Sequence, residues 1–159
     1  MRIRRLTRAE WLVAGLIAAL LGLLALPALA TTRWVGSTDL EVEFVATDAT
    51  TGQPVPGAEV EVWSGGGFYE EREPREFRLA ADPDGRAAYV CRGSMCFGTS
   101  SLFTDTYCVH LPHWWFRVSA PGYEATEPID LDVLEYRRAV RKVGPRGAKL
   151  VVPVSLRKV

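Results

Sequence analysis

The chain has 159 residues, of which 48% are hydrophobic and 24% are charged, and its formal net charge at pH 7 is zero. Without its first 30 residues, which carry four Arg and one Glu, the net charge would be −3. A mildly acidic chain is poorly suited to nucleic acid, so we expect no nucleic-acid partner. The roughly 130 residues that follow the first 30 suffice for one hydrophobic core, and we expect a single domain over residues 31–159.

The first 30 residues form a leader with a basic start and an apolar run over residues 11–30. The basic start contains four arginines: Arg2, Arg4, Arg5 and Arg8. The run reaches the ~20 residues that a membrane-spanning helix needs, whereas Pro27 and the small residues at 28–30 are typical of a signal-peptidase site. Residues 1–30 are therefore predicted to be a signal peptide or a membrane anchor. In both cases the basic end stays inside, which places residues 31–159 outside the cytoplasm, in the periplasm, at the cell surface or secreted.

Beyond the leader, apolar and polar residues alternate in short segments, which is typical of half-buried β-strands. Leu40, Val42 and Phe44, for example, alternate with two glutamates. Seven segments show the pattern: residues 40–44, 58–63, 75–79, 86–90, 114–120, 127–131 and 148–156. Turns rich in Gly and Pro separate them, so the sequence predicts an all-β fold, a single antiparallel sandwich of about seven strands. Apolar residues at helical spacing over 133–143 predict one short helix before Gly144 and Pro145.

Three motifs of turns and strands follow one another along the chain. The first, TGQPVPGAEVEVW, runs from Thr51 to Trp63 and is a turn that leads into a strand. The second, the sequence DPDG at residues 82–85, is a tight turn of the kind that joins antiparallel strands. The third, HWWFRVSAPGY, runs from His113 to Tyr123 and is a strand closed by Pro and Gly.

In this order, from Leu40 to about Leu131, the motifs resemble the prealbumin-like, or transthyretin-like, β-sandwich. Within that fold they are similar to two families, the carboxypeptidase regulatory-like domains and the intradiol ring-cleavage dioxygenases. The dioxygenase pattern is matched further by Trp63, by the tripeptide at 67–69 and by His113. The shared turns specify a fold rather than an activity.

The resemblance to the dioxygenases implies a ferric iron site that acts on a catechol-type substrate. In that family two tyrosines and two histidines hold the iron, and the histidines lie two residues apart on a strand, where both side chains point to one face. Tyr69 matches the first tyrosine and His113 the first histidine, but the second histidine falls on Trp115, whose indole nitrogen cannot bind a metal. His110 stands where the family has Arg, and Tyr107 is a candidate for the second tyrosine. An altered ligand set would thus be Tyr69, Tyr107, His110 and His113.

The three cysteines, Cys91, Cys96 and Cys108, lie in an irregular segment between two predicted strands. In an oxidising compartment, one disulfide and one remaining thiol are expected. Cys91 is predicted to end one strand and Cys108 to lie shortly before the next, so we predict a Cys91–Cys108 disulfide ahead of a Cys96–Cys108 one. The alternative is a zinc site made of Cys108, His110, His113 and a second cysteine, but its ligand spacing is loose for structural zinc.

These features leave three functional interpretations. The loss of a metal-binding position favours a non-catalytic binding or structural module of the cell envelope without a cofactor. Its partner would be an envelope protein, a glycan or, through residues 11–30 of an uncleaved leader, the membrane. The alternative is an intradiol dioxygenase that uses Fe(III). The third interpretation, a carbohydrate-binding module, rests on Trp63, Trp114 and Trp115. The basic cluster at 137–149 is predicted to be a solvated face rather than a membrane-binding surface.

Overall fold

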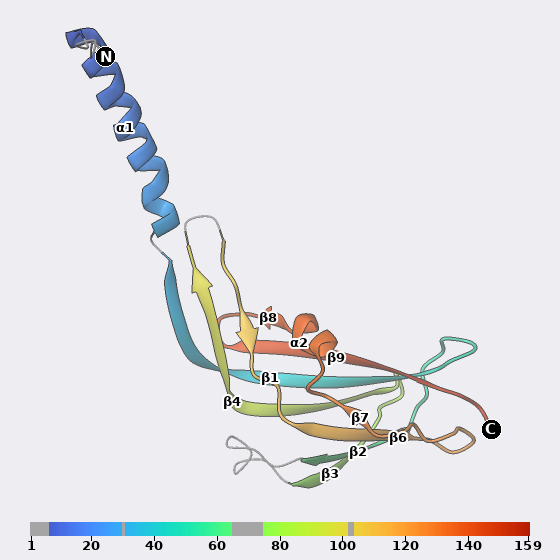
Figure 1. The fold of residues 1–159 in the computed structure, drawn as a ribbon. Coiled ribbons are helices and arrows are strands. Elements are labelled where there is room, and N and C mark those ends of the chain that lie inside the picture. The colour runs from blue at the N-terminus through green and yellow to red at the C-terminus, as the bar shows by residue number, and fades with distance from the viewer. Residues whose placement is uncertain (1–6, 30, 65–74, 102–103) are drawn as a thin grey trace. The chain divides into compact units, whose positions relative to one another are not determined.

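The computed structural model describes residues 7–29, 31–64, 75–101 and 104–159 (Figure 1). The chain divides into two compact units. The first comprises Met1–Trp34 and Gly98–Thr106, and the second comprises Val35–Phe97 and Tyr107–Val159. The second unit contains the core residues and every described residue of the candidate site.

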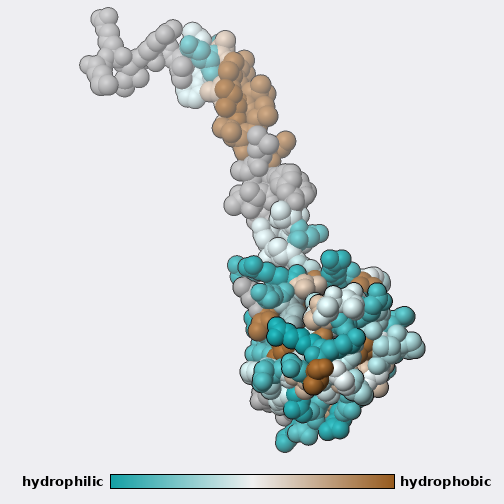
Figure 2. All heavy atoms as spheres, turned by 90° about the vertical axis from the view of Figure 1, so that its right-hand side faces the viewer, coloured by the Kyte–Doolittle hydropathy of each residue, from teal (hydrophilic) through white to brown (hydrophobic). Residues whose placement is uncertain are grey.

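In the first unit, helix α1 spans Arg8–Leu29. A capping box starts it: the Thr7 backbone N–H donates to Glu10 Oε2 at 2.6 Å, and the Glu10 N–H donates to Thr7 Oγ1 at 3.4 Å. The helix carries exposed apolar side chains, seen as hydrophobic surface in Figure 2, and the large ones are Trp11, Leu12, Val13, Leu16, Ile17, Leu20, Leu21 and Leu23. Within the described part of the chain, no helix has both the length and the hydropathy needed to cross a membrane.

The described strands form two sheets, one of five strands in the order β5-β4-β1-β9-β8 and one of four in the order β3-β2-β6-β7 (Figure 1). The strands are β1 Thr32–Asp48, β2 Glu59–Ser64, β3 Glu76–Ala80, β4 Arg86–Ser100, β5 Cys108–Val109, β6 Trp114–Ser119, β7 Ile129–Asp130, β8 Arg141–Val143 and β9 Gly147–Leu156. The predicted all-β, sandwich-like fold is therefore confirmed. Two strands of the described residues, β5 and β8, were not among the seven predicted, because they are only two and three residues long and show too little alternation to be recognised in the sequence.

The five-stranded sheet is mixed rather than antiparallel, because β9 pairs in parallel with β1. Leu40 pairs with Ala148, and Asp48 pairs with Leu156. On its other side, β9 pairs antiparallel with the edge strand β8. Strands β1 and β9 therefore run in one direction, and β8 runs in the opposite direction. Apolar alternation has the same period in parallel and antiparallel strands, so the sequence pattern did not reveal the direction.

The core lies between the two sheets and consists of residues that the alternation predicted. The buried apolar side chains of β1, β2, β6 and β9 include Leu40, Val42, Phe44, Val60, Val62, Trp114, Phe116, Val118, Leu150 and Val152. Phe44 of β1 and Phe116 of β6 meet across the core with ring centroids 5.0 Å apart. On the opposite face of β1, Glu41 and Glu43 lie 2.9 and 3.1 Å from Lys149 Nζ. The two sheets therefore pack face to face with their charged residues outside.

The turn at Asp82–Gly85 was predicted to join two antiparallel strands. In the structure it instead connects the two sheets. Strand β3 before it belongs to the four-stranded sheet, and β4 after it belongs to the five-stranded sheet. Asp82 Oδ1 accepts hydrogen bonds from the backbone N–H groups of Asp84 and Arg86 at 2.9 and 2.8 Å. Gly85 has φ +72°, and a Cβ there would lie 2.5 Å from the Ala46 carbonyl oxygen. Only glycine fits this crossing between sheets.

The three cysteines lie in strands rather than in an irregular loop. Cys91 lies inside β4 instead of ending a strand, and the β4–β5 ladder pairs Cys96 with Val109 and Phe97 with Cys108. None of the three cysteines, all in the described residues, forms a disulfide, so the predicted Cys91–Cys108 bond is not formed. The reason is the register: Phe97 lies opposite Cys108, and Cys91 is further along the same strand, which rises about 3.3 Å per residue.

The helix predicted over 133–143 is present but shorter. Helix α2 spans Leu134–Ala139, and β8 then follows it. The exposed basic residues of this segment include Arg138, Arg141, Lys142 and Arg146. Because β8 is a sheet edge, charges of one sign on it oppose pairing with another chain, which gives part of the basic cluster a structural role.

Asp48, at the end of β1, joins the following turn to the C-terminal end of the chain. Its side chain is buried, and Oδ1 accepts backbone N–H bonds from Thr50 and Thr51 at 2.8 Å each. Oδ2 accepts a bond from the Tyr123 hydroxyl at 3.1 Å and lies 3.3 Å from Lys158 Nζ. These donors, led by the Thr51 and Thr50 N–H groups, hold the pKa of Asp48 well below its usual range.

We expect Asp48→Asn to destabilise the fold at neutral pH and to have a smaller effect in acid. The carboxyl of the unfolded chain titrates near pH 3.9 and that of the folded chain lower, so the charge stabilises above about pH 4. This contribution is lost as the pH falls through the folded-state pKa. Urea denaturation of both proteins from neutral to strongly acidic pH should show their free energies of unfolding converging. A difference that does not vary with pH would contradict the bonds assigned to Asp48.

Candidate functional site

Two of the tryptophans that the sequence singled out, Trp63 and Trp115, lie on the outer face of the four-stranded sheet. Strands β2 and β6 bury alternate side chains, namely Val60, Val62, Trp114, Phe116 and Val118. The residues between them therefore face outward: Glu61 and Trp63 on β2, and Trp115 and Arg117 on β6. The register of the two strands pairs Glu61 with Arg117 and Trp63 with Trp115.

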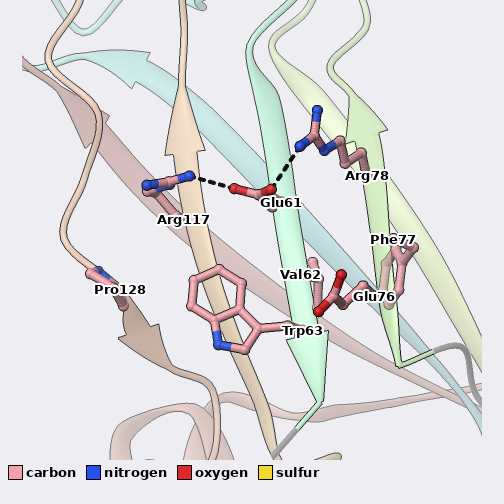
Figure 3. A pocket seen from close by; sticks show the side chains of 8 residues that line it. All are labelled: Glu61, Val62, Trp63, Glu76, Phe77, Arg78, Arg117 and Pro128. Atoms are coloured by element: carbon pink, nitrogen blue, oxygen red, sulfur yellow. Dashed lines mark hydrogen bonds and ion pairs between the residues drawn. The ribbon is translucent and has the colours of Figure 1, made fainter.

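A groove of about 650 Å³ crosses this outer face (Figure 3). We call it the outer-sheet groove. It is lined by residues of β2, β3 and β6 and by one residue before β7, namely Glu61, Val62, Trp63, Glu76, Phe77, Arg78, Arg117 and Pro128. In the view of Figure 3, the Trp63 indole extends from β2 toward Pro128, and the charged groups of Arg117, Glu61 and Arg78 form a row beside it.

The row of charged groups is a cross-strand network centred on Glu61. Arg117 Nη2 donates to Glu61 Oε2 at 2.6 Å, and Arg78 Nη2 donates to Glu61 Oε1 at 2.9 Å. Arg78 Nη1 also lies 3.1 Å from Glu59 Oε1. The hydrogen bond from Arg117, followed by that from Arg78, holds the pKa of Glu61 below its ordinary value. Glu61 therefore stays ionised at lower pH than an isolated glutamate does, and the planar groups of the network are held in place by their bonds.

The two neighbouring tryptophans of β6 have opposite environments. Trp114 is 0% exposed and packs edge-on against Phe77 and Tyr89, with ring centroids 5.1 and 5.5 Å away. Trp115 is 41% exposed and lies on the outer face opposite Trp63, its pairing partner on β2. Of the three tryptophans considered for carbohydrate binding, Trp114 is thus a core residue, and Trp63 and Trp115 occupy opposite positions of neighbouring strands on the outer face.

A second cluster lies at the start of β6. His113 Nδ1 is 3.1 Å from Asp132 Oδ2, and the His110 and His113 rings lie 5.6 Å apart at an angle of 80°. Arg137 donates to both carboxylate oxygens of Asp132 at 2.7 Å. Its hydrogen bonds, followed by the charges of Arg137, His113 and His110, lower the pKa of Asp132. The cluster therefore orients His113 with a carboxylate that Arg137 itself holds in place.

The structure describes three of the four residues of the iron ligand set that the resemblance implied, namely Tyr107, His110 and His113. The structure brings His110 and His113 together, but Tyr107 lies under Lys142, whose Nζ is 5.5 Å from its ring centroid. Tyr69 is outside the described residues. Trp115 occupies the place of the second histidine and has no atom that can bind a metal. In the part of the chain that the structure describes, no group of three or more His, Cys, Asp or Glu side chains is arranged to hold a metal ion.

Sequence reasoning missed the partners that build both clusters. Asp132 and Arg137 reach His113 from the segment after β7, and no local spacing signals such a contact. The network of Glu61 with Arg78 and Arg117 depends on which strands are neighbours. The signal that could have found it was the outward position of Glu61, combined with an outward basic residue on each of two later strands.

No family model matches the sequence, and no curated protein matches it. Several solved structures are similar to the fold. The 3-chlorocatechol 1,2-dioxygenase of Rhodococcus opacus 1CP is 13% identical, with a TM-score of 0.50 over 77% of this chain and 60% of that one. The hydroxyquinol 1,2-dioxygenase of Pseudomonas putida DLL-E4 is 16% identical, with a TM-score of 0.50 over 77% of this chain and 57% of that one. The fold is that of the intradiol ring-cleavage dioxygenases.

The intradiol dioxygenase fold also occurs in a third similar structure. It is the dioxygenase domain of a dioxygenase carbohydrate-binding protein fusion from Streptomyces sp. SirexAA-E, which is 15% identical with a TM-score of 0.50 over 77% of this chain and 81% of that one. The chain spans three-fifths or less of the length of the chlorocatechol and hydroxyquinol enzymes. The likeness confirms the resemblance drawn from the three sequence motifs, and it concerns the fold alone.

Proposed function

We propose that this chain is an exported, non-catalytic binding module with an intradiol dioxygenase fold, and that the outer-sheet groove is its binding surface. The observation that carries the proposal is Trp115, an exposed indole at the position implied for the second iron-binding histidine. Export is supported by the basic leader and the apolar run at 11–30. Iron-dependent ring cleavage would need a metal ligand at position 115, where this chain has an exposed indole.

The carboxylates of the two clusters, Glu61 and Asp132, are suited to holding the structure together rather than to acting as general bases. A general base at neutral pH works best with a pKa near 7. The pKa values of Glu61 and Asp132 are shifted the other way, below their ordinary values, because arginines donate hydrogen bonds to both. Such carboxylates accept protons poorly, and their oxygens already accept hydrogen bonds within the protein.

Iron-dependent ring cleavage is the alternative, and one observation favours it. Metal-binding histidines commonly donate their second ring nitrogen to a carboxylate, and His113 lies against Asp132 in this manner. The His110 ring lies 5.6 Å from the His113 ring and would provide a second imidazole for a metal. If iron bound here, His110 and His113 would be ligands from the described residues, and the iron would supply activation of a catecholate.

The test is the iron content and oxygen uptake of the full chain. We expect less than stoichiometric iron after purification with ferric iron supplied, and no oxygen uptake on catechol or 3-chlorocatechol. The 3-chlorocatechol 1,2-dioxygenase of Rhodococcus opacus 1CP is the positive control in the same assay. Stoichiometric iron together with oxygen uptake, both lost in Tyr69→Phe and His113→Ala, would overturn the proposal and assign the site.

A further inference from the structure

We infer that the outer-sheet groove binds a neutral saccharide chain, with sugar rings stacked on Trp63 in the groove and on Trp115, which is paired with Trp63 on the same face beside the groove. The inference rests on the proposed function, because it names the ligand class of that binding surface. Four observations support it: the two outward tryptophans in and beside the groove, the charge balance of its lining, its fixed hydrogen-bonding groups and its extent across the sheet.

The aromatic pair provides a stacking surface that has no role in the core. Trp63 is half-buried and lines the groove, and Trp115, its register partner on β6, is 41% exposed on the same face outside the groove lining. Aromatic rings are most often placed inside, where each buries a large apolar area, so a pair exposed on adjacent strands indicates a ligand. The apolar C–H face of a pyranose ring matches an indole face, whereas its hydroxyl groups need polar neighbours.

The charges in the groove favour a neutral ligand. The charged lining residues are two carboxylates, Glu61 and Glu76, and two guanidinium groups, Arg78 and Arg117. Their formal charges cancel, and Glu61 is ion-paired to both arginines. An anionic or cationic ligand would have to compete with these pairs, whereas hydroxyl groups can join them as donors or acceptors without any change in charge.

The hydrogen-bonding groups are already fixed before a ligand arrives. A guanidinium group has five N–H donors, and in the described residues the groove contacts of Arg117 use Nη2 while those of Arg78 use Nη1 and Nη2. The remaining N–H groups can donate to sugar hydroxyls. Because the strands and ion pairs hold these side chains, binding would cost little side-chain entropy.

The groove is long enough for more than one sugar ring. Its lining residues come from β3, β2 and β6 and from Pro128 before β7, which are successive strands of the sheet. Strands are spaced about 4.8 Å apart, so three spacings extend over roughly 14 Å. A volume of about 650 Å³ lies in the ordinary range for ligand sites and fits a short oligosaccharide.

The test is calorimetric titration of the full chain with four neutral hexasaccharides, those of glucose, mannose, xylose and N-acetylglucosamine, and with hexagalacturonate as the anionic comparison. We expect binding of at least one neutral chain and tighter binding of it than of hexagalacturonate. Trp115→Ala should weaken that binding about tenfold, and Trp115→Phe, which keeps an aromatic face, should weaken it less. Phe97→Ala is the matched control, because Phe97 is 43% exposed on the other sheet and should leave the affinity unchanged.

Three outcomes would overturn the inference: no binding of any neutral chain, equal affinity in the wild type and Trp115→Ala, or preference for hexagalacturonate. The iron and oxygen assays distinguish failure of the saccharide inference from failure of the proposed function. If saccharides do not bind and the iron and oxygen assays are negative, only the ligand class is wrong. If the iron and oxygen assays are positive, the non-catalytic interpretation itself is wrong.

Discussion

Replacement of Trp114 by Ala is expected to lower the free energy of unfolding by about 3–5 kcal/mol, the range for removing a buried aromatic side chain. Trp114 is fully buried and meets Phe77 and Tyr89 at ring distances of 5.1 and 5.5 Å, so its loss leaves a cavity between the sheets. A loss of this size is a large part of the stability of a small domain. Urea denaturation of the full chain, followed by circular dichroism in the far ultraviolet, measures it.

Two control variants isolate the cause. In Trp114→Phe most of the ring packing is kept, and a buried Nε1 that has no hydrogen-bond partner among the described residues is removed. Because an unsatisfied buried donor costs about 1–3 kcal/mol, this change should be much milder than Trp114→Ala. Trp115→Ala removes the exposed neighbour and should change stability by about 0.5 kcal/mol or less. Equal losses in Trp114→Ala and Trp115→Ala would contradict the assigned faces of β6.

The faces of the strands could be predicted from the sequence, whereas their directions and neighbours could not. The alternation of Leu40, Val42 and Phe44 predicted which side chains enter the core, because a strand has a period of two. That period is unaffected by whether the next strand is parallel, so the pairing of β1 with β9 was missed. The Asp82 turn was assigned to a hairpin for the same reason: its residues specify a tight turn but not which sheet the chain enters next.

For the candidate site as well, some relations between residues could be predicted from the sequence and others could not. Two residues on one strand separated by two positions share a face, so the relation between His113 and Trp115 could be read from the sequence. The partners of these residues could not. Asp132 reaches His113 from beyond β7, and Glu61 meets Arg78 and Arg117 from two other strands. Contacts between segments far apart in the chain depend on the packing of the sheet, which composition and spacing do not encode.

Trp115→His is expected to raise the affinity of the full chain for ferric iron by about tenfold or more, because it adds an imidazole on the face that carries His113. The Nδ1 atom of His113 lies 3.1 Å from Asp132 Oδ2, so a metal would bind through the other ring nitrogen, with Asp132 fixing the ring. Arg137 in turn fixes Asp132 through bonds of 2.7 Å to each oxygen. Equilibrium dialysis against ferric citrate measures the affinity, and a visible absorption band would indicate tyrosinate ligation.

A double variant separates a shared metal pocket from unspecific binding by a new surface histidine. If His113 and the substituted position act together, Asp132→Asn in the Trp115→His background should reduce iron affinity by about 10- to 100-fold, the usual effect of losing a supporting carboxylate. In the wild-type background the same change should leave iron binding as weak as before. Phe97→His, at a comparably exposed position on the other sheet, is the control and should not raise affinity. If Trp115→His and Phe97→His behave alike, the position of Trp115 is only a surface site, and the assignment of a lost metal ligand fails.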